Sequence, residues 1–371
     1  MQSTMETTDE RGNIRLEGLR KEFGDIVAVD GVDLEVKAGE FFTVLGPSGC
    51  GKTTTLRMIA GLETPTAGSV HISGEDVTHL SADKRNTSII FQEWALFPHM
   101  SVGSNISFGL EMEDVSKSER KKRVEEVLEL VELSGYEGRP VSDLSGGQKQ
   151  RIAMARSVVL EPDVLLLDEP LASLDRALGE RLQVELKNIQ EELGITFVHV
   201  THDQEEALTM SDRIGVMNDG RLQQVGPVTE LYEHPSNTFV AEFLGETNLF
   251  EGTVRHEKGH VRMDCDGDDL DLAAADGGEQ AVQDGGPCAY TVRPEQMNAE
   301  AAADDEMWEN QWTGTVENAI YKGSTTLYEV DVGTRILQVQ EQRSKDTSMY
   351  DEGDQIVVGF KPDDGEFIPE S

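Results

Sequence analysis

A chain of 371 residues that is 37% hydrophobic is long enough for two domains and can bury a core in each. Its 71 acidic and 32 basic residues give a net charge of -39, which disfavours nucleic-acid binding because such a field repels phosphates. The sequence has no apolar run of membrane-spanning length, no signal-peptide pattern at its start and only three scattered cysteines. These properties predict a protein that stays inside the cell.

The excess of acidic residues is spread along the whole chain. Residues 246–371 hold 29 acidic and 9 basic residues, so about half of the net charge lies in this part and half in the first 245 residues. An acidic tail that binds cations is one interpretation, and whole-surface acidity that keeps a protein soluble in concentrated salt is the other. The even spread favours the second and predicts a salt-adapted, halophilic source.

Short apolar runs alternate with helical stretches through the first 245 residues, which is typical of an α/β domain with a largely parallel sheet. Val32, Leu34 and Val36 alternate with polar residues and predict a half-exposed strand in a small antiparallel sheet. Strands short and apolar enough to be buried on both faces are predicted at 41–45, 88–91, 164–167 and 195–200.

A helical block lies between the second and third of these buried strands. Ser116 or Ser118 is placed to cap its first helix, and the apolar residues that follow recur at the spacing of one helix face: Val124, Val127, Leu128 and Val131. We interpret this block as a helical subdomain inserted into the α/β domain.

The sequence changes character after about Gly245. Runs with high β-propensity at 288–292, 325–332 and 355–360 alternate with turns rich in Gly and Asp, which predicts a second, β-rich domain such as a small barrel. The segment 264–286 is biased toward Asp, Gly and Ala but lacks the ligand spacing of an EF-hand loop, so we interpret it as a solvated loop or hairpin.

A phosphate-binding loop is predicted directly after the strand at 41–45. The pattern G-x-x-x-x-G-K-[ST] is fitted by Gly46, Pro47, Ser48, Gly49, Cys50, Gly51, Lys52 and Thr53, followed by Thr54 in a helix-like segment. Its backbone N–H groups and the helix N-terminus can bind phosphate, Lys52 can reach the β and γ phosphates, and the Thr53 hydroxyl can bind Mg²⁺. A chance Gly-rich turn is the alternative, but the strand and helix context favours nucleotide binding.

Cys50 lies inside this loop. It is most simply a small residue that fills space, but the helix N-terminus can also lower a thiol pKa and make Cys50 reactive.

Two carboxylates follow the apolar strand at 164–167. Asp168 is suited to hold Mg²⁺, and Glu169 to orient or deprotonate an attacking water, since ligands bind at the carboxyl ends of strands in open α/β sheets. Taken alone, the two acidic residues are about as well explained as caps of the next helix.

A second anion-binding turn precedes the helix-like run that begins at Gln148. It consists of Leu144, Ser145, Gly146, Gly147 and Gln148. This segment resembles the signature motif of the ATP-binding-cassette (ABC) family, which contacts the γ-phosphate held by the partner's phosphate loop. The resemblance implies a homodimer with ATP and Mg²⁺ as ligands.

Other motifs of this family occur in order along the chain. The resemblance implies that Phe23 stacks on adenine, that Gln92 senses Mg²⁺ and γ-phosphate at the hinge of the helical subdomain, and that His202 contacts γ-phosphate and supports the catalytic Glu169. Leu174 and Asp175 resemble the dimer-contact loop, although Ala172 and Ser173 reverse the family's usual order of residues before it. The implied Mg²⁺ ligands are Thr53, Gln92 and Asp168.

The C-terminal part resembles the TOBE-type, OB-like regulatory domain of ABC importers, in the segments that begin at Asn237 and Thr291. The implied fold of residues 14–245 is an α/β P-loop NTPase (RecA-like) core with antiparallel β and helical subdomains, the helical one at about 93–160. A β-rich OB-like domain is expected at 246–371. Residues 1–13 are expected to be disordered.

The resemblance is greatest to the spermidine/putrescine subgroup, in the runs around Gly245 and Lys322, with sugar or ferric iron import and a soluble ABC ATPase as alternatives. It implies a peripheral protein at the cytoplasmic face of the membrane. Its implied partners are two integral-membrane permease subunits and, indirectly, an extracytoplasmic solute-binding protein, with no nucleic acid.

Overall fold

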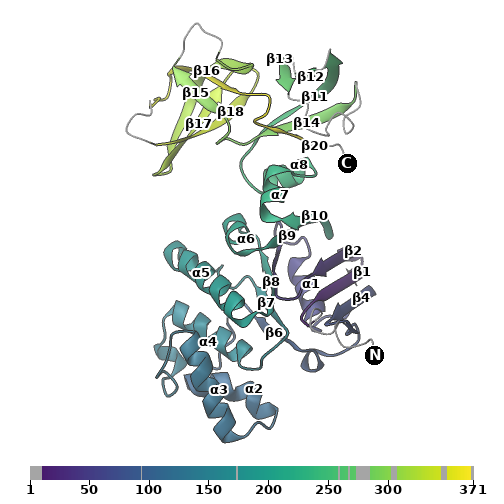
Figure 1. Cartoon of the computed structure of the whole chain (residues 1–371), viewed down its shortest axis with the longest axis vertical. Helices are drawn as coiled ribbons and strands as arrows, with labels where there is room; N and C mark the ends of the chain where they lie inside the picture. Colours follow the sequence, from purple (N-terminus) through teal and green to yellow (C-terminus); the bar gives the residue numbers. More distant parts are fainter. Residues whose placement is uncertain are drawn as a thin grey trace, which may run out of the picture. The chain divides into compact units, whose positions relative to one another are not determined.

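The computed structural model describes residues 11–92, 94–172, 174–257, 260–265, 268–272, 285–301, 307–343 and 349–368. Two compact units, Met1–Val228 and Thr229–Ser371, make up the chain (Figure 1). The division comes earlier than the predicted boundary at 245, because the buried Arg293 of the second unit donates hydrogen bonds to the backbone oxygens of Tyr232, Ala241 and Gly245. The predicted disordered segment 1–13 lies mostly outside the described residues.

A six-stranded sheet is the centre of the first unit, in the order β10-β9-β3-β8-β7-β6. Its strands are β3 (Phe41–Leu45), β6 (Thr87–Ile90), β7 (Val164–Asp168), β8 (Thr196–Thr201), β9 (Arg213–Asn218) and β10 (Arg221–Pro227). All neighbouring pairs are parallel except β10 with β9. Every residue of β3, β7 and β8 is buried, which confirms the two-sided burial predicted for these strands. The same prediction for 88–91 is wrong, because β6 ends the described sheet and only its Ile90 is buried.

A separate antiparallel sheet has the order β2-β1-β4-β5, with β1 (Ile14–Phe23), β2 (Ile26–Val36), β4 (Ala67–Ile72) and β5 (Glu75–Asp76). Val32, Leu34 and Val36 are buried while the residues between them are exposed, so the predicted half-exposed strand is confirmed. Their apolar side chains join Phe42 and Val44 of β3 in one core.

The described residues up to 210 also form eight helical segments in the first unit. They are α1 (Lys52–Ile59), η1 (Ala82–Lys84), α2 (Val102–Met112), α3 (Lys117–Leu130), η2 (Val141–Asp143), α4 (Gly146–Val158), α5 (Arg176–Leu193) and α6 (Gln204–Met210). Ser116, one of the two predicted caps, accepts a hydrogen bond from the Glu119 N–H at the start of α3. Val124, Leu128 and Val131 are buried in the core shared with α2 and α4, so the predicted helical block is confirmed.

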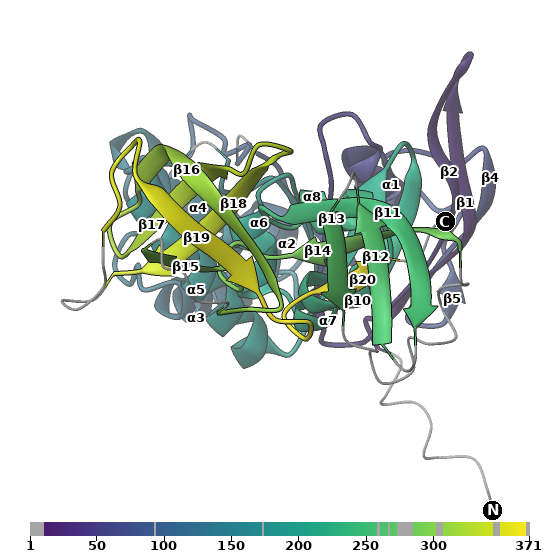
Figure 2. The same cartoon turned by 90° about the horizontal axis from the view of Figure 1, so that it is seen from above.

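The second unit begins within α7 (Val228–Glu233), continues through α8 (Thr238–Phe243) and forms two five-stranded antiparallel sheets, visible from above in Figure 2. One sheet contains β11 (Asn248–Glu257), β12 (His260–Cys265), β13 (Asp268–Leu272), β14 (Pro287–Val292) and β20 (Glu366–Ile368); the other contains β15 (Asn298–Ala301), β16 (Asn310–Tyr321), β17 (Thr325–Asp331), β18 (Ile336–Gln342) and β19 (Gln355–Phe360). The predicted β-rich character is confirmed.

An aromatic core joins these two sheets. The Phe250 ring centroid lies 5.8 Å from Trp312 and 5.5 Å from Phe360, and the Tyr290 centroid lies 6.0 Å from Phe360. The acidic segment 264–286 is described only in part, since 266–267 and 273–284 lie outside the described residues. Where it is described, β12 and β13 are paired antiparallel, with Val261 opposite Leu272 and Cys265 opposite Asp268.

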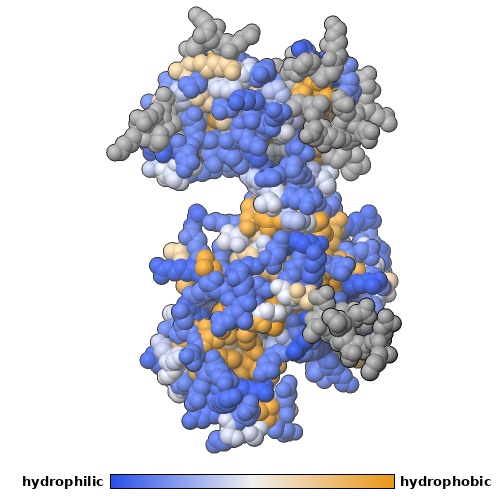
Figure 3. Space-filling model, viewed as in Figure 1, coloured by the Kyte–Doolittle hydropathy of each residue, from blue (hydrophilic) through white to orange (hydrophobic). Residues whose placement is uncertain are grey.

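The described surface is mainly hydrophilic on the face shown in Figure 3, in keeping with the net charge of -39. Among the described residues, no helix has the length and apolar character needed to cross a membrane. The predicted salt adaptation remains a prediction.

Candidate nucleotide site

The predicted phosphate loop connects the end of β3 to the start of α1. Gly51, just before α1, has a left-handed backbone with φ of 109°, and a Cβ there would lie 2.4 Å from the Ala28 oxygen. A Cβ on Gly46 would lie 2.2 Å from the Met217 oxygen. Both positions therefore require glycine, because strand residues pack directly against the loop backbone.

Lys52 turns back into this loop. Its Nζ donates hydrogen bonds to the oxygens of Gly46 at 2.7 Å and Pro47 at 2.9 Å, and only 4% of the residue is exposed. The loop backbone thus holds a positive charge at the N-terminus of α1, where an anion is favoured.

Thr53 and Asp168 bring two hard oxygen ligands together. The Thr53 hydroxyl donates to Asp168 Oδ1 at 3.0 Å, although the two residues are 115 positions apart. Burial raises the pKa of the Asp168 carboxyl, while the Thr53 hydrogen bond opposes the rise. A hydroxyl and a carboxylate beside a phosphate loop fit Mg²⁺, which prefers oxygen ligands.

Glu169 and His202 meet at the ends of β7 and β8. His202 Nδ1 lies 3.2 Å from Glu169 Oε2, with the His202 side chain 51% exposed and that of Glu169 22% exposed. The Glu169 backbone is left-handed, with φ of 46°, and its N–H donates to the Val200 oxygen at 3.1 Å. A non-glycine residue in this region is strained, so the neighbouring strand holds the carboxylate in an otherwise unfavourable direction.

The signature segment forms the start of α4. Ser145 caps this helix by accepting a hydrogen bond from the Gln148 N–H, and the Gln148 side chain accepts one from the Ser145 N–H. Leu144 is buried, whereas Ser145 is exposed. A Cβ on Gly146 would lie 3.8 Å from Leu174, and one on Gly147 would lie 3.1 Å from Leu178, so the helix start packs closely on the segment around α5.

The remaining predicted residues lie in three places. Phe23, 45% exposed, ends β1 with Lys21 Nζ 4.8 Å from its ring centroid. Gln92 is exposed after β6, and Asp175 caps α5 by accepting from the Leu178 N–H. Ser173, half of the reversed Ala-Ser pair, lies outside the described residues.

Arg156 is a residue of this region that the sequence did not indicate. Its guanidinium, on α4, donates to the oxygens of Trp94 at 3.0 Å and Ala95 at 2.7 Å. Trp94 and Ala95 both have left-handed backbones, with φ of 58° and 45°. The helix that starts with the signature segment therefore holds the strained turn that follows Gln92. A contact across 61 positions leaves no local pattern in the sequence.

Cys50 differs from one interpretation of the sequence. It is 5% exposed, and burial raises the pKa of its thiol, although Lys52 opposes the rise. The predicted lowering of the thiol pKa by the helix N-terminus is therefore wrong, because desolvation of the thiolate outweighs it.

Alkylation of Cys50 is expected to be slow at neutral pH, to abolish ATP binding because the added group fills the loop, and to be slowed further by bound ATP. Peptide mass spectrometry alongside a nucleotide-binding assay measures both effects, with Cys50→Ser as the insensitive control. Full modification that left ATP binding intact would contradict this expectation.

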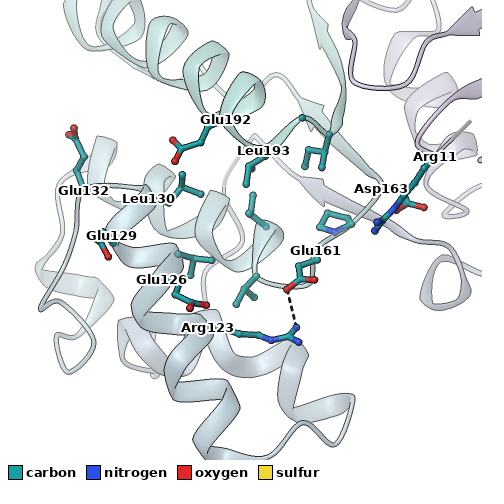
Figure 4. Close-up of a pocket in the computed structure, with 16 residues that line it drawn as sticks. Arg11, Arg123, Glu126, Glu129, Leu130, Glu132, Glu161, Asp163, Glu192 and Leu193 are labelled. Atoms are coloured by element: carbon teal, nitrogen blue, oxygen red, sulfur yellow. Dashed lines mark hydrogen bonds and ion pairs between the residues drawn. The ribbon is translucent and has the colours of Figure 1, made fainter. Parts of the chain in front are cut away.

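A cavity lies away from these residues. It has a volume of about 860 Å³ and is lined by α3, the end of α4 and the residues before β7 and β8. Figure 4 shows several carboxylates around it; Glu161 pairs with Arg123 at 3.4 Å and Asp163 with Arg11 at 2.6 Å. None of the predicted site residues lines it, so this cavity is separate from the candidate nucleotide site.

Comparisons with known proteins identify the family of this chain. Residues 29–172 match the ABC transporter family, and residues 290–367 match the TOBE domain. A spermidine/putrescine import ATP-binding protein of Rubrobacter xylanophilus is 50% identical over 317 residues, covering 85% of this chain and 82% of that protein. One of Thermobifida fusca with the same description is 46% identical over 345 residues, covering 92% and 88%.

Solved structures have a similar fold over more than half of this chain. The protein cbiO1 of Clostridium perfringens, part of an ABC transporter complex, has a TM-score of 0.56 at 31% identity and covers 60% of this chain and 90% of its own. A dimeric ATP-binding cassette bound to ADP and Pi has a TM-score of 0.51 at 33% identity, covering 58% and 98%. The chain therefore belongs to the ABC transporter family, as an ATP-binding subunit with a TOBE domain in its C-terminal part.

Proposed function

We propose that the chain is a transport ATPase that hydrolyses ATP at two composite sites in a homodimer. One subunit contributes to each site the phosphate loop 46–54 and the side chains of Phe23, Gln92, Asp168, Glu169 and His202. The other subunit contributes residues 144–148. Leu174 and Asp175 lie at the proposed dimer contact. The observation that carries this proposal is the pair of contacts at the strand ends, Thr53 with Asp168 and Glu169 with His202.

These side chains divide the work of phosphoryl transfer. Lys52 and the loop N–H groups bind the phosphate oxygens, while Glu169 orients the attacking water and accepts its proton. His202, in contact with Glu169, fixes the carboxylate and can donate to the γ-phosphate. Mg²⁺ would be held by Thr53, Gln92 and Asp168 and would neutralise charge on the phosphates.

The signature segment is proposed to complete the site of the partner subunit. The capping box leaves Ser145 exposed at the positive end of the 13-residue helix α4, which suits a phosphate oxygen of a second molecule. The dimeric form of the similar cassette bound to ADP and Pi supports this arrangement.

The transported solute is proposed to be a polyamine, spermidine or putrescine. The relatives that cover most of this chain are described as spermidine/putrescine import ATP-binding proteins, at 42–50% identity. The ATPase would act at the cytoplasmic face of the membrane with two permease subunits, and a solute-binding protein outside would deliver the polyamine to them.

Uptake of labelled spermidine, maltose and ferric iron tests this proposal in cells whose native gene carries Glu169→Gln. Loss of spermidine uptake alone is expected. The matched control is Glu161→Gln, which also changes a glutamate with a left-handed backbone (φ of 52°) but lies in the cavity distant from the phosphate loop. Loss of maltose or iron uptake alone would assign another solute, and unchanged uptake of all three would contradict polyamine transport.

A further inference from the structure

A chain of buried polar side chains lies beneath the turn that carries His202. His199 on β8 is fully buried, with Nδ1 3.3 Å from Thr43 Oγ1, and Thr43 accepts a hydrogen bond from the Ser211 hydroxyl at 2.6 Å. On the other side of the ring, His199 Nε2 lies 3.5 Å from Glu206 Oε2 and has no assigned hydrogen bond among the described residues. A buried ring nitrogen in this position requires a partner.

Glu206 connects this chain to the turn between β8 and α6, which are consecutive in Figure 1. Thr201 donates its hydroxyl hydrogen to Glu206 Oε2 at 2.7 Å, and the same hydroxyl oxygen accepts from the Asp203 N–H at 3.0 Å. The Glu206 N–H donates to Asp203 Oδ1 at 3.1 Å and closes the helix cap. Both neighbours of His202 are therefore fixed through Glu206.

We propose that Glu206 is a positioning residue for His202, and that its carboxyl group must carry a proton for full ATP hydrolysis. The inference rests on the proposed ATPase function and adds a residue to it. A protonated Glu206 donates its O–H to the open Nε2 of His199 while accepting from Thr201, so both buried partners are satisfied.

The surroundings favour this protonated form. Burial raises the pKa of Glu206 to about 7, although the hydrogen bond from Thr201 opposes the rise. Burial also lowers the pKa of His199 to about 3, so His199 is neutral near pH 7 and cannot balance the charge of an ionised Glu206. Asp203 and Glu169 add to the rise in the Glu206 pKa, and His202 opposes it.

Within the described part of the chain, the other elements packed against α6 bring no neutralising charge to Glu206. On α5, Arg176 lies 3.6 Å from Glu205, the neighbouring residue, and 2.8 Å from Glu180. On β3, the side chains that contact His199 are the uncharged Thr43 and Phe41. An ionised Glu206 would therefore add a negative charge behind Glu169 and the phosphate site.

Loss of the proton also rearranges the hydrogen bonds beneath the turn. When Glu206 releases its proton to solvent, the proton on neutral His199 must move from Nδ1 to Nε2 so that the ring can donate to the carboxylate. The Thr43 hydroxyl must then turn to donate to Nδ1. Two arrangements of the same side chains are thus linked to one titration near neutral pH.

The pH profile of ATP turnover tests this proposal. For the wild type, kcat is expected to fall by roughly tenfold as the pH rises through about 7, the order expected for one buried like charge near the reacting phosphate. Glu206→Gln, whose amide reproduces the neutral acid, should retain the activity measured at pH 6 and lose this fall. The matched control Glu205→Gln should keep it. The same fall in Glu206→Gln as in the wild type would overturn the proposal.

Removal of the side chain tests the positioning role. Glu206→Ala is expected to lower kcat at every pH, with the KM for ATP unchanged, because the loop and Phe23 are untouched. A wild-type kcat in a folded Glu206→Ala protein would overturn the role, and a misfolded variant leaves the decision to the pH profile of Glu206→Gln.

Unfolding without nucleotide separates this inference from the proposed function. Because the pKa of Glu206 is raised on folding, its contribution to stability is full below its unfolded value and is lost as the pH rises through about 7. Urea unfolding between pH 5 and 8 should therefore show a shallower loss of stability for Glu206→Gln than for the wild type. Equal slopes would overturn the inference, whereas a wild-type protein without ATPase activity would instead overturn the proposed function.

Discussion

Glu169→Gln is expected to lower ATP turnover by roughly 10²- to 10⁴-fold, the range that a positioned general base contributes, while ATP binding is retained. The amide keeps the size of the side chain and can still contact His202, which lies 3.2 Å from the carboxylate. It cannot accept the proton of the attacking water. The nucleotide should therefore remain intact between the subunits and hold the dimer closed.

Three measurements check this expectation: phosphate release, nucleotide affinity and the mass of the complex in solution with ATP. The control Glu161→Gln, a glutamate with the same unusual backbone that pairs with Arg123 at 3.4 Å, should behave as the wild type in all three. A Glu169→Gln protein that released phosphate at the wild-type rate would remove Glu169 from the mechanism and leave the attacking water without an assigned base.

The parts of this site that the sequence could predict are those with local physical causes. The phosphate loop is continuous in the chain, and its glycines, lysine and flanking strand and helix follow one another between residues 41 and 59. The alternating exposure of β2 and the Ser116 cap are equally local, since each depends on neighbours within a few positions.

The parts that the sequence could not predict depend on contacts between distant positions. The burial that raises the pKa of Glu206 comes from strands packed around it, and the clamp of Arg156 on Trp94 joins residues 62 positions apart. The structural division after Val228 precedes the predicted boundary at 245 for the same reason. Arg293, which follows β14, donates hydrogen bonds to the backbone of α7 and α8. Periodicity cannot reveal such pairings.

Lys52→Ala is expected to weaken ATP binding itself by roughly 10- to 100-fold, from the loss of a charge-assisted hydrogen bond of about 1.5–3 kcal/mol. The ammonium group is already held in the loop by the oxygens of Gly46 and Pro47, so it meets the phosphates without large movement. Its removal also leaves those two oxygens without their donor. Glu169→Gln is expected to bind ATP but not to hydrolyse it, whereas Lys52→Ala is expected to bind ATP more weakly. The two variants should therefore differ in their measured affinity for ATP.

Titration of the nucleotide against the intact chain, with Mg²⁺ present, measures this affinity for Lys52→Ala. Lys84→Ala is the control, because Lys84 is exposed on η1 and lies outside the loop. Equal affinity for wild type and Lys52→Ala would mean that the buried ammonium serves only the loop backbone. Because the loop is proposed to bind the phosphates through Lys52, this result would contradict the assignment of residues 46–54 as the ATP site.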